Sequence, residues 1–224
     1  MLPTACRTAP TSKSVALRLT HLRQSKMIAL PNAMFEINRR VQMSVFEKMK
    51  STLGAYSDTD VRGLLHADHV RILELAKDLA ETDSAAHRKS VLRELKPFLT
   101  AHSRSEEAVV YAALMQLRNS PDSREAGNEG MVEHNLADIV VERLANTYDA
   151  TSDMWKAHAK VLYEALEHHI KEEEGTAFEE LGEHFTAEER EAMGTQFVQG
   201  KERIAGLSSA RTARSRKRSV ETVE

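Results

Sequence analysis

The chain has 224 residues, of which 41% are hydrophobic and 29% charged, and its formal net charge is −3 at pH 7. This composition suits one globular domain with tails, and the near-balanced charge points to no particular class of partner. A single cysteine, Cys6, excludes an internal disulfide framework and fits a reducing compartment such as the cytoplasm. No apolar run is long enough to span a bilayer, so we expect no membrane insertion. The low counts of Gly and Pro, 9 and 5, favour an all-α protein.

The first 32 residues are predicted to form a tail. Residues 1–26 contain five basic residues but no acidic one, and they are rich in Ser and Thr. This composition resembles that of an organelle transit peptide, which makes a mitochondrial location the alternative to the cytoplasm. A disordered tail, and a protein that starts at Met27, are the other interpretations.

The next segment, residues 33–58, is predicted to contain an accessory helix. Apolar residues recur at four-residue steps from Ile37 to Leu53, and Gly54 is a good C-terminal cap. We expect this helix to pack on the flank of the domain that follows.

Four further stretches between residues 59 and 185 each carry one inward-facing stripe. The stripes are Leu65, His69, Ile72, Ala76 and Leu79; Leu92, Leu95, Leu99, His102, Glu106 and Val109; His134, Ala137, Val141 and Leu144; and Leu162, Ala165, His169, Glu173 and Leu181. Pro97 is expected to kink the second stretch or to mark its true start. Residues 119–130, NSPDSREAGNEG, are predicted to form the one clear loop, between two helical hairpins.

The two hairpins repeat each other. DHVRILELAKDLAET, from residue 68, corresponds to EHNLADIVVERLANT, from residue 133, and HSRSEEAVVYAAL, from residue 102, corresponds to HIKEEEGTAFEEL, from residue 169. The second copy therefore lies about 66 residues downstream of the first. Two hairpins of amphipathic helices with short links predict an all-α fold, an up-down four-helix bundle over residues 59–185.

The C-terminal segment is predicted to add one helix and a tail. Thr186 and Glu189 form a capping box that opens a helix over residues 186–206. Residues 207–224 are basic, small and polar, so we expect them to be disordered. No aromatic residue is interleaved with these basic residues to stack on bases, and nucleic-acid binding is therefore not expected.

Six ionisable residues continue the inward stripes and are expected to share one core layer: His69, His102, Glu106, His134, His169 and Glu173. Such a layer would be very costly if its members were unpaired, whereas imidazole and carboxylate groups together suit zinc, iron or manganese. The set is too large for one tetrahedral zinc ion and suits two ions that share carboxylates. A buried histidine–glutamate network without metal is the alternative. The neighbouring His168, Glu172 and Glu174 fall on other faces and are expected in solvent.

The motif elements DH at 68, HSRSEE at 102, EH at 133 and HIKEEE at 169 resemble those of hemerythrin-like domains of the HHE cation-binding type, over about residues 60–185. The resemblance implies a non-haem pair of iron ions, with zinc or manganese as alternatives. It also implies that the four histidines of the layer are terminal ligands and that its two glutamates bridge the ions. Ferritin-like proteins use Glu-x-x-His instead, which disfavours the ferroxidase family.

One position departs from this resemblance. Oxygen-carrying hemerythrins have His-x-x-x-His on the third helix of the bundle, whereas here Asp138 stands four residues after His134. Either Asp138 is a seventh ligand, or one iron ion has fewer protein ligands and a more open face. In a third interpretation, Asp138 leans outward into solvent.

The expected function is that of a di-iron protein that binds or senses O2 or a related small molecule such as nitric oxide or peroxide. A di-iron enzyme that reduces peroxide or oxidises a small substrate, and an iron store, are the alternatives. The oligomeric state is left open. We expect a small ligand to enter through an apolar layer beside the metals, with Asp138 as the only charge at its border; this layer comprises Ile72, Ala76, Leu95, Leu99, Ala137, Val141, Leu162, Ala165 and Leu166.

Four other residues are minor candidates. His66, one turn before His69, is expected either to face the site or to cap the helix from an exposed position. Tyr111 and Phe178 each stand nine residues past a histidine and are expected to pack one end of the bundle rather than to act as redox partners. Trp155 is expected to seal the opposite end.

Overall fold

The structure, a computed structural model, describes residues 56–221, with side chains described as far as residue 206. Every regular element in this range is helical, which confirms the all-α prediction. The predicted tail over residues 1–32, and all of the predicted helix segment 33–58 except its last three residues, lie outside the described residues. Among the helices that are described, none combines the length and the apolar character needed to cross a membrane.

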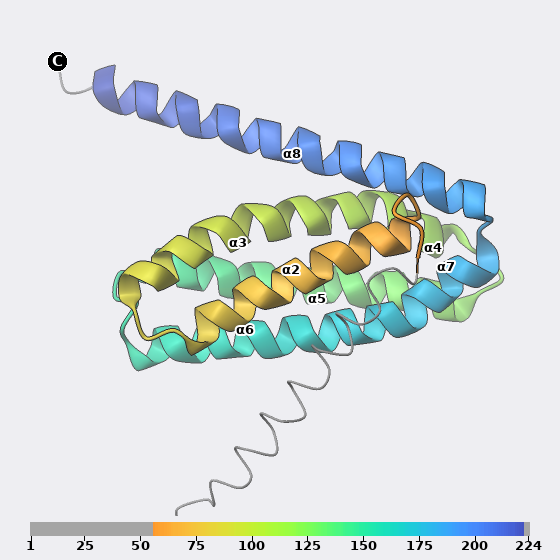
Figure 1. Ribbon diagram of the computed structural model, residues 1–224, viewed down its shortest axis with the longest axis horizontal. Coiled ribbons are helices and arrows are strands. Elements are labelled where there is room, and N and C mark those ends of the chain that lie inside the picture. Colours follow the sequence, from red (N-terminus) through yellow and green to blue (C-terminus); the bar gives the residue numbers. More distant parts are fainter. Residues whose placement is uncertain (1–55, 222–224) are drawn as a thin grey trace, which may run out of the picture. The chain divides into compact units, whose positions relative to one another are not determined.

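Four long helices surround the core: α2 (Val61–Glu81), α3 (Ala85–Glu106), α5 (Pro121–Asn146) and α6 (Asp153–Glu172). α2 contacts α3 and α6, and α5 contacts the same two helices, so that the four close a ring (Figure 1). The chain therefore forms a helical bundle whose interior receives side chains from all four helices.

Shorter helical segments extend two of the long helices, and one further helix covers the bundle. They are the π-helical turn η1 (Glu107–Tyr111) and α4 (Ala112–Gln116), the π-helical turn η2 (Glu173–Ala177) and α7 (Phe178–His184), and α8 (Ala187–Glu221). α3 continues through η1 into α4, and α6 continues through η2 into α7. α8 lies against α3, α2 and η1 (Figure 1).

Each long helix begins at a side chain that caps its first turn. The backbone N–H groups of Arg62, His87, Ser123 and Trp155 donate to the side chains of Asp60, Ser84, Ser120 and Ser152, respectively. The first N–H groups of a helix have no partner within it, so these caps stabilise the point at which each helix starts.

The predicted loop over residues 119–130 is wrong, because α5 begins at Pro121. Ser120 caps this helix, and Pro121 occupies its first turn, where a missing N–H group leaves no hydrogen bond unmade. Gly130 is buried, and a Cβ atom at this position would lie 2.5 Å from the ring of Tyr111. Close helix packing, rather than a turn, thus explains the glycine that suggested a loop.

Two helix boundaries differ from simple expectation. Pro97 lies inside α3, which begins twelve residues earlier at Ala85, so the proline does not mark the start of that helix. α8 continues to Glu221, beyond its predicted end at residue 206 and into the segment that we expected to be disordered. Neither Gly nor Pro follows Gly206 in α8, and the Ala and Arg residues there favour helix.

A polar layer separates two clusters of buried apolar side chains. The larger cluster includes Ile72 and the predicted end residue Trp155, and the second includes Leu65 and Phe197. Along α2, His69 lies between Leu65 of one cluster and Ile72 of the other. The layer is therefore shielded by apolar side chains above and below it.

Candidate metal centre

The six residues predicted to share a core layer are all buried, with exposed fractions between 0% and 6%. They are His69 from α2, His102 and Glu106 from the end of α3, His134 from α5, His169 from α6 and Glu173 from the first position of η2. Burial of so many ionisable groups is unfavourable unless they find partners, so their contacts determine what the layer can hold.

The two glutamates join the two halves of the repeat. Each places one oxygen near the Nε2 atoms of one histidine from each hairpin: Glu106 Oε2 is 3.3 Å from His102 and 3.4 Å from His134, and Glu173 Oε2 is 3.3 Å from His69 and 3.6 Å from His169. Each carboxylate is thus in position to serve two neighbouring sites.

The possible ligand atoms form two groups of three, and within each group they all lie within 4.8 Å of one another. One group comprises His69, His102 and Glu106, and the other comprises Glu106, His134 and His169. Each group takes both histidines of one hairpin, and Glu106 belongs to both groups. Two adjacent sites that share a carboxylate suit a pair of metal ions.

Every histidine of the layer is held from behind by a second carboxylate. The Nδ1 contacts are His69 with Glu174 (2.9 Å), His102 with Asp68 (3.1 Å), His134 with Glu107 (3.1 Å) and His169 with Glu133 (2.7 Å). A carboxylate that accepts from Nδ1–H leaves the lone pair on Nε2, and it fixes the ring with that atom toward the centre. Glu174 was expected in solvent, and that expectation is wrong.

These four carboxylates follow the internal repeat. Asp68 and Glu133, which immediately precede a histidine, each contact the other histidine of their own hairpin. Glu107 and Glu174 directly follow the two glutamates of the layer, and each contacts a histidine of the opposite hairpin. The sequence did carry this signal, because an acid precedes His in both DH and EH, and a second Glu ends both HSRSEE and the run HIKEEE.

Both glutamates of the layer lie where an α-helix changes into a π-helical turn. η1 begins directly after Glu106, and η2 begins at Glu173. A π-helical turn holds more residues than an α-helical one, so consecutive side chains diverge less in direction. Glu106 and Glu107 can therefore both face the layer, one toward Nε2 of His102 and the other toward Nδ1 of His134. Such turns are rare and frequently mark functional sites.

The electrostatics of the layer demand positive charge beside its carboxylates. Burial raises the pKa of Glu106 well above its ordinary value, and the neighbouring carboxylate of Glu173 raises it further. Burial also acts to raise the pKa of Glu173, but the contact with His69 lowers it well below the usual range. Burial acts to lower the pKa of His69, yet Glu173 and Glu174 raise it to about 10. A bound metal cation would stabilise the buried carboxylates, as protons on Glu106 and His69 otherwise do.

Unsatisfied atoms at the centre fit the binding of metal at these residues. Nε2 of His69, both side-chain oxygens of Glu106 and Oε2 of Glu173 are buried and have no hydrogen-bond partner within the described part of the chain. An unmade hydrogen bond at a buried polar atom is destabilising, whereas these same atoms are electron-pair donors. Imidazole nitrogen with carboxylate oxygen is a donor set that suits iron, zinc and manganese.

The structure does not bring Asp138 into either group of ligands. Its carboxylate pairs with Arg104, and 34% of its side chain is exposed. Arg104 also pairs with Glu107, which in turn contacts His134. Asp138 is thus connected to the centre through two intervening side chains, at a half-exposed position.

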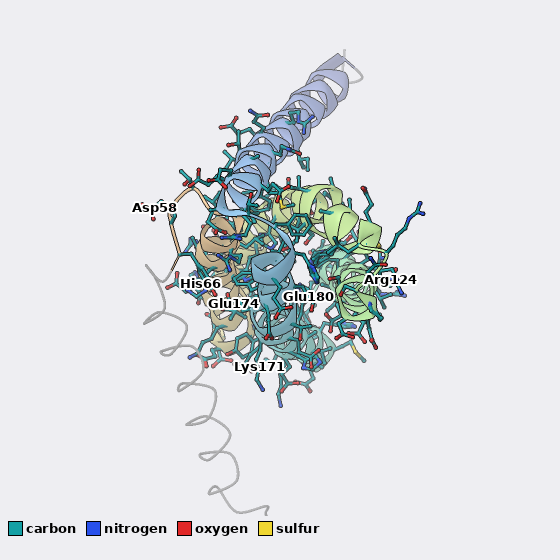
Figure 2. The ribbon with its side chains drawn as sticks, turned by 90° about the vertical axis from the view of Figure 1, so that its right-hand side faces the viewer. Asp58, His66, Arg124, Lys171, Glu174 and Glu180 are labelled. Atoms are coloured by element: carbon teal, nitrogen blue, oxygen red, sulfur yellow. The ribbon has the colours of Figure 1, made fainter. Side chains whose placement is uncertain are left out.

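His66 is buried, which corrects the expectation of an exposed cap. Its exposed fraction is 2%, and its Nδ1 atom lies 2.8 Å from the carboxylate of Glu174. Figure 2 shows the two residues beside each other, His66 on α2 and Glu174 on η2. Glu174 therefore contacts two histidines, His66 and His69, through the same oxygen.

Tyr111 and Phe178 belong to the second apolar cluster and also contact the layer. The ring of Phe178 stacks on His69 with centroids 6.2 Å apart. The hydroxyl group of Tyr111 donates to Oε1 of Glu173 at 3.1 Å. Tyr111 thereby helps to fix the orientation of that carboxylate.

The apolar layer predicted for small-ligand access is mostly packed core. Eight of its nine residues belong to the larger apolar cluster, but Ala165 is exposed. A cavity of about 340 Å³ instead reaches the polar layer between α5 and η2, and Tyr111, His169 and Glu173 contribute to its lining. Further acidic residues line this cavity, and Asp138 is not among its lining residues. These acids are Asp122, Glu125, Glu129, Glu133 and Glu172.

Comparisons with known proteins agree with this geometry. A family model described as the hemerythrin HHE cation binding domain matches residues 60–181. A DNA nickase from Nostoc sp. (strain PCC 7120 / SAG 25.82 / UTEX 2576) is 20% identical over 147 residues, which are 66% of this chain and 40% of that protein. The chain thus spans less than half of the length of this relative. No solved structure matches the chain.

Proposed function

Because this chain belongs to the hemerythrin HHE cation-binding family, we propose that its buried histidines and glutamates hold two iron ions and that the centre binds or senses O2 or a related small molecule. The observation that carries the proposal is the pair of three-ligand groups that share Glu106. A cation-binding family supports a metal at these residues, and the number and type of the donors favour a pair of iron ions over a single zinc ion.

We further propose that the four long helices run alternately up and down along the bundle. Figure 1 supports this order, because α2 and α3 run in opposite directions, as do α5 and α6. His69 lies in the first half of α2, whereas His102 and His169 lie near the ends of α3 and α6. His134 lies just past the middle of α5, because that helix already begins at Pro121. Alternating directions then bring the four imidazole rings to one level.

Each residue has a defined part in the proposed centre. His69 and His102 would hold one ion and His134 and His169 the other, while Glu106 and Glu173 would be shared between them. An iron pair would supply the electrons and the open coordination position that a diatomic ligand needs. The carboxylates behind the rings keep the Nε2 atoms aimed inward, and the apolar clusters exclude bulk water.

The iron content of the purified protein, with its optical spectrum under nitrogen and under air, tests this proposal. We expect about two iron ions per chain, and a spectrum that changes on exposure to air and returns when oxygen is removed. Asp138→Leu is expected to keep both ions, because this carboxylate pairs with Arg104. Loss of half of the iron in that variant would make Asp138 a ligand. A protein without iron, or a spectrum that is indifferent to oxygen, would overturn the proposal.

A di-iron enzyme is the second candidate, and one observation favours it. The hydroxyl group of Tyr111 lies 3.1 Å from Glu173, which places a proton donor beside the centre. Steady consumption of peroxide by the iron-loaded protein would support this alternative over reversible binding. DNA nicking is the printed activity of a relative of which this chain spans only 40%, and we do not extend it to this protein.

A further inference from the structure

We propose that divalent cations reach the buried centre through the acid-lined cavity between α5 and η2, and that His168, Glu172 and Glu133 form an outer site where the cation first binds. This inference rests on the proposed metal function of the inner centre. It assigns a role to His168 and Glu172, two ionisable residues of α6 that lie outside that centre.

The outer site is a third group of potential ligands with its own geometry. The ligand atoms of Glu133, His168 and Glu172 all lie within 4.8 Å of one another. Nε2 of His168 is 3.5 Å from Glu172 and 4.0 Å from Glu133. The side chains of His168 and Glu172 are 62% and 55% exposed, so an ion in solution can reach them. One imidazole and two carboxylates suit the same metals as the inner donors.

Glu133 connects the outer site to the inner centre. One of its oxygens accepts from Nδ1 of His169 at 2.7 Å, and the other faces His168. His168 and His169 are adjacent in the chain, and so are Glu172 and Glu173. Two His-x-x-x-Glu pairs therefore lie side by side along α6 and the start of η2, one at the surface and one buried.

The proposed path is lined by acidic side chains, from exposed positions on α5 to the buried Glu173. Asp122, Glu125, Glu129 and Glu133 follow each other at three- and four-residue steps, so they share one face of α5. Within the described part of the chain, no lysine or arginine lines this cavity. A groove lined by one sign of charge raises the local concentration of ions of the opposite sign.

A buried ligand atom lies at the inner end of this path. Glu173 lines the cavity, its side chain is only 3% exposed, and its Oε2 atom lacks a hydrogen-bond partner among the described residues. A cation that passes the acidic wall therefore meets a carboxylate oxygen that lies between His69 and His169. This atom distinguishes the cavity from a group of merely solvated acids.

The corresponding face of the first hairpin is closed. Phe197 of α8 packs edge-on against His102, with ring centroids 5.7 Å apart. Lys201 of α8 pairs with Asp68, the counterpart of Glu133 in the repeat. α8 thus covers one side of a centre whose ligands are nearly symmetric, whereas the side of His169 opens into the acidic cavity.

The rate at which the metal-free, full-length protein takes up Co2+ in stopped-flow measurements tests this route. Two double variants change it: His168→Gln with Glu172→Gln at the outer site, and Glu125→Gln with Glu129→Gln along the wall. We expect each to slow uptake by about tenfold, and to weaken its dependence on salt, while the final amount of bound metal stays the same. Glu142→Gln with Glu164→Gln is the matched control, because both acids are exposed and lie outside the cavity.

The outcomes separate the route from the function on which it rests. If the unaltered protein takes up no Co2+ at the inner centre, the proposed function fails. If it takes up two ions but both double variants load as fast as the control, the centre stands and the proposed route is wrong. Slower uptake in the two double variants, with the control unchanged, supports the route.

Discussion

A carboxylate behind each ring sets the chemistry of the individual histidines. A buried imidazole can carry its proton on either nitrogen, and only one arrangement leaves Nε2 free to bind a metal ion. The contacts of Nδ1 with Glu174, Asp68, Glu107 and Glu133 select that arrangement at all four positions. At the scale of single residues, these contacts orient the four rings so that their Nε2 atoms are free to hold a metal ion.

Removal of one such carboxylate is expected to weaken metal binding, although all six residues of the layer remain. Glu174→Gln removes the charge that His69 contacts at 2.9 Å, and we expect metal affinity to fall by about tenfold or more. Equilibrium titration with Co2+ against a competing chelator measures the change. Glu164→Gln, an exposed glutamate that pairs with Lys160 on α6, is expected to bind as tightly as the unaltered protein. Equal affinities in all three proteins would show that Glu174 does not support the site.

Close packing between α5 and η1 fixes the position of Tyr111 beside the centre. Gly130 allows the ring of Tyr111 to lie against the α5 backbone, and from there the Tyr111 hydroxyl reaches Glu173. α5 begins at Pro121, twelve residues before the repeat segment that starts at Glu133, and Gly130 lies within this additional stretch. At this scale, a glycine in a helix is a packing requirement and not a break.

Gly130→Ala is expected to lower the free energy of unfolding by about 1–3 kcal/mol, because its Cβ would overlap the ring of Tyr111 and force it to move. Chemical denaturation monitored by circular dichroism measures this loss. Gly175→Ala is the control, since no atom lies within 4 Å of a Cβ at that position. We expect its free energy of unfolding to stay within about 1 kcal/mol of the original. A control as unstable as Gly130→Ala would refute the packing explanation.

The junction of α2 with α8 depends on the charge of Asp60. This residue caps α2 and is 6% exposed, and its carboxylate accepts from Arg62 and from Arg190 of α8. Burial acts to raise the pKa of Asp60, but the two arginines outweigh it and lower the pKa from 3.8 to about 2. The stabilisation is therefore complete above the unfolded value of 3.8, and it is lost as the pH falls toward about 2.

Asp60→Asn tests how much the charge of Asp60 stabilises the protein, because asparagine is also a good helix cap. At neutral pH we expect the variant to be less stable by roughly 1–2 kcal/mol, and this difference should narrow as the pH falls below 3.8. Thermal unfolding of both proteins across this pH range measures the trend. Asp58→Asn, at an exposed position nearby, is expected to match the unaltered protein throughout. A difference that stays constant with pH would mean that the charge of Asp60 is not responsible.

For the molecule as a whole, the repeat explains why so much could be predicted. The spacing of His69, His102, His134 and His169 within apolar stripes was enough to place all four in one layer, because helical periodicity decides which residues face inward. The internal repeat then supplied the two glutamates. Periodicity could not reveal Glu174, since its contact with His69 joins α2 to η2 and depends on a π-helical turn.

The features that escaped prediction depend on the exact approach of neighbouring helices. Ala165 continues a four-residue stripe but is exposed, because a stripe gives a direction and not the width of the buried face. The acid-lined cavity arises because α5 starts at Pro121, and the sequence alone suggested a loop there. α8 lies against α2, α3 and η1 of the first hairpin, which makes the surroundings of a nearly symmetric ligand set unequal.

Anomalous diffraction at the iron absorption edge, from crystals of the iron-loaded protein, tests the central claim most directly. We expect two peaks roughly 3.5–4 Å apart, one beside His69 and His102 and the other beside His134 and His169, with Glu106 and Glu173 between them. A single peak in this layer, or iron bound only at surface residues, would contradict a paired centre.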